Sequence, residues 1–249
     1  MKKIYYLLAS LLLVPFIDAF GSFGSENGHD YIDLELPSGT LWATANVGAN
    51  MPEAYGDYFA WGEIEPKKSY SWSNYKYGTN ESSITKYCCD SVVGKDGFVD
   101  GKTMLEAADD VAHVKWGGRW TMPTEDQWKE LSTQCYWVWT ENYGGTGSNG
   151  YIVYKAKRRD DKGARAYKGT KPVELYSMSD VHIFLPATGC RFEETLSYSG
   201  SYGYYWASVL DTNEDTQYGA LYVGFRAASV YHNYYYRYYG HAVRPVINK

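Results

Sequence analysis

The chain has 249 residues, of which 24 are Lys or Arg and 29 are Asp or Glu, so the formal net charge is -5 at neutral pH. An acidic chain lacks the excess of cations that binding to nucleic-acid phosphates requires, so a nucleic-acid partner is not expected. Aromatic residues make up 18% of the sequence and glycine is frequent, which favours short strands and tight turns over long helices.

The first residues have the pattern of a secretory signal peptide. Two lysines precede a largely apolar run from Ile4 to Ile17, and small residues follow near Ala19 and Gly21. The apolar run is shorter than a membrane-spanning helix needs. We therefore expect residues 1–21 to be removed on export to the periplasm, the outer surface or the medium. Residues 22–249 are then expected to form one domain without a membrane span.

Four cysteines, Cys88, Cys89, Cys135 and Cys190, are spaced without a metal-binding pattern. Export permits disulfides, and the three possible pairings stay open at this stage. No zinc site or other cofactor is expected. The acidic segment 211–215 could hold a structural calcium ion, although its composition is more typical of a turn.

Two segments have helical spacing of apolar residues. The first covers about 102–114. The second covers about 124–134 and begins with a capping box, in which Thr124 is the N-cap and Gln127 the third helical residue.

The rest of the mature chain is predicted to form short antiparallel strands separated by turns, so the fold class is α+β with two helices. The basic segment 155–171 is predicted to be a solvated hairpin or loop, with an anionic-ligand patch as the alternative. The expected strands are 31–34, 41–46, 58–61, 150–154, 182–185, 204–208, 218–224 and 242–246.

The segment from Val230 to His241 is the most unusual part of the chain, because it holds six tyrosines in twelve residues. Neither a strand nor a helix can turn all of these rings toward a core. Several must therefore be exposed, and a dense exposed aromatic patch is typical of a binding surface. Tyrosine with Ser, Asn, Gly and Arg is also the composition of antibody paratopes.

Several motifs, taken in order, resemble bacterial surface proteins with the C-type-lectin-like fold of formylglycine-generating enzymes. They extend over nearly all of the expected mature chain. The resemblance implies that Arg119, Trp120, Trp206 and Arg244 are core or network residues. The motifs are Tyr31–Thr44, Gly56–Glu63, Gly117–Thr124, Phe184–Gly189, Tyr205–Ser208 and Ala242–Val246.

Within that group, the C-terminal region is similar to the variable proteins of diversity-generating retroelements. Their error-prone copying randomises template adenines, mostly in AAC codons. Such changes produce Tyr and His readily but never Lys, Glu, Gln, Met or Trp, and residues 218–241 contain none of these five types. We therefore expect a diversified surface that binds a protein or glycan on a cell or phage. Arg237 would be either a ligand contact or a scaffold residue. The expected ligand-binding residues are Tyr222, Arg226, Ser229, Tyr231, His232, Asn233, Tyr234, Tyr235, Tyr236, Tyr238, Tyr239 and His241.

Other functions remain as alternatives. A lectin or adhesin of fixed specificity would use the same aromatic rings, although the calcium-binding triplets of C-type lectins are absent. A structural cell-surface protein would use the tyrosines for self-association. An oxidase of the formylglycine-generating type is least expected, because no cysteine follows Cys190 to supply the nucleophile near the C-terminus. We therefore expect no enzymatic activity.

Overall fold

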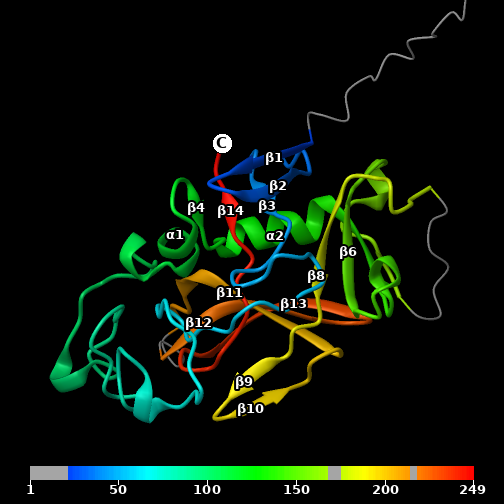
Figure 1. Cartoon of the computed structure of the whole chain (residues 1–249). Coiled ribbons are helices and arrows are strands. Elements are labelled where there is room, and N and C mark those ends of the chain that lie inside the picture. The colour runs from blue at the N-terminus through cyan, green and yellow to red at the C-terminus, as the bar shows by residue number, and fades with distance from the viewer. Residues whose placement is uncertain (1–21, 168–174, 214–217) are drawn as a thin grey trace, which may run out of the picture.

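A computed structural model describes residues 22–167, 175–213 and 218–249, and places them in four small sheets with two α-helices (Figure 1). The expected α+β class is confirmed. The expected signal peptide lies outside the described residues, as do parts of the basic segment 155–171 and of the acidic segment 211–215.

The first sheet joins the two ends of the chain, in the order β1-β2-β3-β14-β4. Val246 of β14 pairs with Trp42 on one side and with Thr121 on the other, so the last strand lies between two early ones. The strands are β1 (Phe23–Glu26), β2 (His29–Asp33), β3 (Leu41–Ala43), β4 (Trp120–Thr121) and β14 (Val246–Ile247).

Three further sheets lie in the described part of the chain. The four-stranded sheet has the order β7-β5-β6-β8, the three-stranded sheet the order β11-β12-β13, and β9 pairs with β10 alone. Their strands are β5 (Cys135–Thr140), β6 (Gly150–Lys155), β7 (Arg165–Ala166), β8 (His182–Pro186), β9 (Cys190–Phe192), β10 (Thr195–Ser197), β11 (Tyr202–Leu210), β12 (Gly219–Arg226) and β13 (Ser229–Tyr236).

Helix α2 (Glu125–Gln134) begins at the predicted capping box, with the Thr124 hydroxyl accepting from the Gln127 amide. It lies between the sheet of β1–β3 and the sheet of β11–β13 (Figure 1). Trp128 bridges the two, with its ring 4.7 Å from Trp42 and 5.7 Å from Tyr205. The helix therefore fixes one face of the β11–β13 sheet against the core.

The predicted helix over 102–114 is wrong in its extent, because α1 covers only Val111–Trp116. The Asp110 carboxylate accepts from the amides of Ala112 and His113, which sets the helix start there. Before it, the Leu105 amide donates to the Ser208 carbonyl, so this part of the chain runs alongside β11. Short 3₁₀ turns complete the helical elements: Trp72–Asn74, Lys95–Gly97, Ala107–Asp109, Tyr143–Gly145 and Arg159–Asp161.

Three expected strands are also wrong in part, and the first of them, 41–46, is strand only over Leu41–Ala43. Segment 58–61 makes only an isolated bridge, from Phe59 to His241, and segment 242–246 is strand only at its end. The tyrosine-rich segment as far as Tyr236, by contrast, forms strand β13, which the strand prediction did not include.

The framework residues implied by the resemblance are mostly buried. Trp120, Trp206 and Arg244 are fully enclosed. Arg119 is an exception, because its side chain is 58% exposed and pairs with Glu26 at 2.6 Å on the surface. Arg119 is therefore part of a surface network with Glu26 and not part of the core.

Two polar segments differ in detail from a plain solvated loop. Asp161 of the basic segment is buried, and its carboxylate pairs with Arg158 and accepts from the Tyr176 hydroxyl. Asp211 is also buried, and its Oδ1 accepts from the Asn213 amide in a local turn. In the residues that the structure describes, no cluster of three His, Cys, Asp or Glu side chains is placed to hold a metal ion. The four cysteines are unpaired.

Candidate functional site

Strands β12 and β13 form a hairpin with a two-residue turn at 227–228, and Arg226 pairs with Ser229 at its closed end. Aromatic and β-branched residues at most other positions favour this extended conformation. Within the described part of the chain, β13 has β12 as its single strand neighbour, so β13 is the edge of its sheet. The tyrosine-rich segment therefore lies along an open edge.

Successive side chains of β13 point to opposite faces of the sheet. On one face, Tyr231 and Tyr235 lie 6.2 and 5.7 Å from the ring of Tyr222. On the other face, His232 approaches Ser132 of helix α2, with its Nε2 3.4 Å from the hydroxyl. The candidate site consequently wraps around the edge strand and is not confined to one face.

The face away from α2 carries a connected layer of phenol rings, which we call the tyrosine surface. Tyr204 stacks on Tyr222 at 5.6 Å, and Tyr235 meets Tyr239 edge-on at 4.4 Å. These spacings are those of favourable aromatic pairs. The tyrosine surface comprises the half-buried rings of Tyr202, Tyr231, Tyr235 and Tyr239 and the buried rings of Tyr204 and Tyr222 beneath them.

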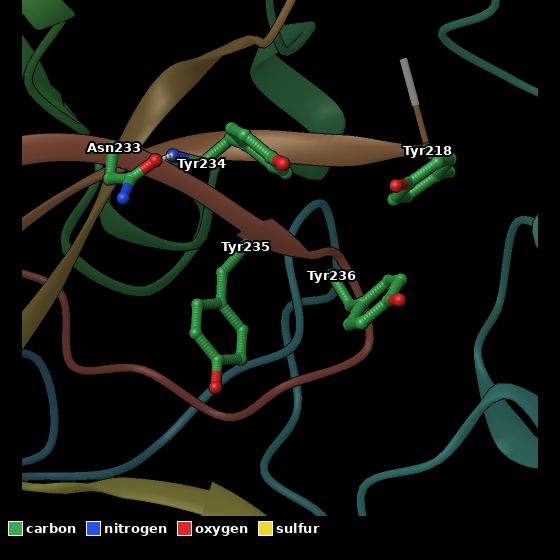
Figure 2. A pocket seen from close by; sticks show the side chains of 5 residues that line it. All are labelled: Tyr218, Asn233, Tyr234, Tyr235 and Tyr236. Atoms are coloured by element: carbon green, nitrogen blue, oxygen red, sulfur yellow. Dashed lines mark hydrogen bonds between the residues drawn. The ribbon is translucent and has the colours of Figure 1, made fainter. Parts of the chain in front are cut away.

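A pocket of about 310 Å³ opens beside the edge of β13. Figure 2 shows Tyr218 and Tyr236 side by side along one wall, while Tyr235 points away from Tyr234. Tyr218 and Tyr236 stack at 5.3 Å. The Asn233 Oδ1 accepts from the Tyr234 amide at 2.8 Å, where a further strand would otherwise bond. The pocket thus offers phenol rings and a carboxamide on an open edge.

The expected contacts differ widely in exposure. Arg226, Asn233 and Tyr234 are exposed, and Tyr234 is the most open ring of β13 at 38%. Half-buried residues, which still reach solvent, are Ser229, Tyr231, His232, Tyr235, Tyr236 and Tyr239.

Three of the expected contacts, Tyr222, Tyr238 and His241, are buried, so the expectation that they lie at the surface was wrong. The chain turns inward after Tyr236. The His241 amide and carbonyl bond to Phe59 in the scaffold, which draws this residue beneath the tyrosine surface. Arg237 is also buried, its guanidinium 5.6 Å from the Trp61 ring and bonded to the Lys86 carbonyl. The structure therefore makes Arg237 a scaffold residue.

Sequence reasoning missed part of the surface. From the sequence alone, Tyr204 is expected only in a strand, and Tyr202 is not expected at the site. Phe192 of the β9–β10 hairpin stacks on Tyr239 at 5.0 Å, and Trp72 lies 6.2 Å from Tyr236. Alternate tyrosines at 202 and 204 were a signal for one aromatic strand face. No sequence pattern linked Trp72 or Phe192 to it.

Burial raises the pKa of the Tyr231, Tyr235 and Tyr239 phenols further above neutral pH, so these three phenols stay protonated there. Each hydroxyl can therefore donate a hydrogen bond as well as accept one. The site is suited to neutral hydrogen bonding combined with apolar contact.

The ring of Tyr231 packs directly over Gly224, its cross-strand partner, in the space that a side chain at position 224 would fill. A Cβ atom at position 224 would lie 2.5 Å from two atoms of that ring. Gly224→Ala should therefore push the Tyr231 ring aside and lower the free energy of unfolding by about 1 kcal/mol. Urea unfolding measures this cost. In a Tyr231→Ala background the same change should hardly alter the free energy of unfolding. An unchanged loss of stability there would contradict the packing of the Tyr231 ring over Gly224.

His241 lies under the tyrosine surface, stacked on Trp206 at 4.0 Å. Neither ring nitrogen has a hydrogen-bond partner among the described residues, and burial lowers the pKa of His241 well below 6.5. Tyr204, Tyr222, Tyr235 and Tyr239 are the titratable groups whose rings face it.

We therefore expect His241 to make the fold acid-sensitive. Above pH 6.5 both states are neutral and the stability is fully present. As the pH falls below 6.5 only the unfolded state gains the proton, so stability is lost by about 1 kcal/mol between pH 7 and 5.5. Urea unfolding at the two pH values should show this extra loss in the wild type but not in His241→Phe. Equal losses would refute the assignment, because His29, His182 and His232, whose pKa values burial also lowers, are present in both proteins.

In the described part of the chain, no helix is long and apolar enough to span a membrane. Comparisons with protein-family models, curated proteins and solved structures find no match to this chain.

Proposed function

We propose that this protein is an exported binding protein that presents a diversified, tyrosine-rich surface on a C-type-lectin-like scaffold. Its ligand is a protein or glycan on a cell or phage surface, and residues 218–241 are the target of a diversity-generating retroelement. The observation that carries the proposal is the position of the tyrosine run along the open edge strand β13.

The chemistry of this edge suits recognition of varied ligands. Tyrosine provides a large amphipathic contact area with few rotatable bonds, so little conformational entropy is lost on binding. Asn233 adds an adaptable amide, and Arg226 adds an exposed cation whose Nε donates to Ser229 at 3.3 Å. We propose binding and no reaction at this edge.

The region 218–241 contains accessible positions on the edge strand as well as enclosed ones, and this supports diversification of the accessible positions. Side-chain changes at Tyr231, Tyr234 or Tyr236 leave the main-chain ladder of β12 and β13 in place. Changes at Arg237 or His241 would alter groups enclosed by the scaffold. The structure thus predicts two kinds of position within the region 218–241.

DNA sequencing of the locus in many clones tests the proposal. We expect a near-identical template repeat, a reverse-transcriptase gene, and substitutions limited to template adenines. Variation should be frequent at the accessible positions and rare at Arg237 and Gly240, which are buried. The positions expected to vary most are 231, 232, 234, 235, 236 and 239.

A fixed sequence without a template would overturn diversification. The alternative would then be a lectin or adhesin of fixed specificity, for which aromatic rings provide stacking faces for sugars, or a structural surface protein. Glycan screening and sedimentation of the purified protein distinguish these two cases.

A further inference from the structure

A second pocket lies next to the tyrosine surface, across strand β9. Its volume is about 540 Å³, and it is bounded by the segments 56–58 and 66–70 and by the β9–β10 hairpin. Neighbouring residues of a strand face opposite sides. Phe192 stacks on Tyr239 at the tyrosine surface, whereas Arg191 lies over the ring of Tyr58, 5.2 Å from its centroid. The two sites are therefore adjacent but share no lining residue.

Among the residues with described positions, Arg191 is held in place without a protein counter-ion. Its amide donates to the Gly240 carbonyl at 2.8 Å, and its carbonyl accepts from the Gly240 amide at 2.9 Å. Over the residues that the structure describes, no carboxylate lies within 4.0 Å of its guanidinium and no side-chain hydrogen bond forms. Arg119 and Arg158 differ, because each pairs with an acid. The guanidinium is thus free to bind a planar anionic group.

Two other polar side chains of the pocket already form hydrogen bonds within the protein. The Lys67 Nζ donates to Glu63 and to Asn74 at 3.1–3.2 Å. The Tyr70 hydroxyl donates to the Tyr58 carbonyl and accepts from the Lys67 amide. Lys68 is exposed and adds a second cation at the rim.

Two carboxylates, Asp57 and Glu194, line the same pocket. They accept hydrogen bonds from hydroxyl groups and repel a second negative charge. The pocket therefore combines one free guanidinium for an anion with acceptors for neutral donors. A compact monoanion that also carries hydroxyls satisfies both requirements, and a phosphate dianion does not.

We infer that this pocket binds a carboxylate-bearing sugar, as found in the uronic acid residues of glycans. Arg191 pairs with the sugar carboxylate, and Asp57 and Glu194 accept from its hydroxyls. The volume of the pocket lies within the range of small-ligand sites. None of its lining residues falls within 218–241, so the inference does not rest on diversification of that region.

Titration of the mature protein with sodium glucuronate, followed by amide NMR, tests the inference. Saturable shifts are expected at residues 57, 191, 194 and 240, with dissociation constants in the millimolar range. Glucose, which has no carboxylate, and inorganic phosphate should produce no saturable shifts there. Absence of saturable shifts with glucuronate overturns the site, whatever the outcome of locus sequencing.

Two variants test the proposed roles of Arg191 as the partner of the sugar carboxylate and of Glu194 as an acceptor for the sugar hydroxyls. Arg191→Gln should weaken glucuronate binding at least about tenfold, because a charge-assisted hydrogen-bonded pair is lost. Arg165→Gln, a change at an exposed arginine of another sheet, is the matched control and should bind as the wild type does. Glu194→Gln should strengthen acetate binding, because a repelling charge is lost, and should strengthen glucuronate binding by a smaller factor, because the amide oxygen is a weaker acceptor for the sugar hydroxyls. Equal glucuronate binding by Arg191→Gln and wild type overturns the anion site, and acetate or phosphate binding as tight as glucuronate binding overturns the sugar assignment.

Discussion

Trp206→Ala should lower the free energy of unfolding by about 3–5 kcal/mol, because it empties a large enclosed space in the core. Trp206 is 0% exposed, its Nε1 donates to the Phe59 carbonyl at 2.8 Å, and its ring stacks on His241. The alanine variant loses the packing, the hydrogen bond and the support beneath the tyrosine surface. Urea unfolding measures the loss.

Tyr234→Ala is the matched comparison within the same sheet. Its ring is 38% exposed, so the change should cost less than about 1 kcal/mol of stability. If Tyr234 is a binding hot spot, the same change should weaken ligand binding by about 1–3 kcal/mol. Tyr236→Ala should lie between Tyr234→Ala and Trp206→Ala in stability, because Tyr236 packs against Tyr218 and Trp72. A loss for Tyr234→Ala as large as that for Trp206→Ala would refute the division between surface and scaffold.

Arg244→Ala should destabilise the protein by about 4–5 kcal/mol. The guanidinium of Arg244 is fully buried and donates four hydrogen bonds, at 2.8–3.0 Å, to Asn46, Ala43, Thr44 and Phe184. Three of the acceptors are main-chain carbonyls, and two of these, Ala43 and Phe184, belong to different sheets. Removing the donor leaves buried acceptors unsatisfied and creates a cavity as well.

The lysine variant and a surface arginine provide the controls. Arg244→Lys keeps the charge but replaces the planar fork by a single nitrogen, so it should recover only part of the loss. Arg119→Ala removes an exposed ion pair and should cost less than about 1 kcal/mol. Urea unfolding of the three variants together gives the comparison. A cost for Arg244→Ala as small as that for Arg119→Ala would show that the buried network contributes little.

Local patterns predicted the start of helix α2 well and the start of α1 poorly. The capping box at Thr124 combines a side-chain acceptor with a reciprocal glutamine, and both bonds lie within four residues. The apolar spacing over 102–114 resembled a helix, but Leu105 bonds to Ser208 of β11 instead. A partner about a hundred positions away cannot be recognised from local periodicity.

Burial in the tyrosine-rich segment was also predictable only in part from local patterns. Composition alone required that several rings be exposed, and strand alternation of β13 spreads them over two faces. Whether a given residue reaches solvent depended on what packs against it. Gly240 bonds to Arg191, and His241 bonds to Phe59, so the chain after Tyr236 is drawn inward.

The sequence by itself determined the fold class, the second helix, the buried Trp206 and Arg244, and the presence of exposed tyrosines near the C-terminus. The fold class, the second helix and the exposed tyrosines follow from residue type and from spacing over a few positions, whereas the burial of Trp206 and Arg244 was implied by the resemblance of their motifs to a known fold. Only the tertiary structure decided that Arg237 and His241 belong to the scaffold, that Tyr202 and Phe192 extend the aromatic surface, and that Arg191 has no counter-ion among the described residues. Those properties depend on contacts between segments far apart in the chain, whose packing no local pattern encodes.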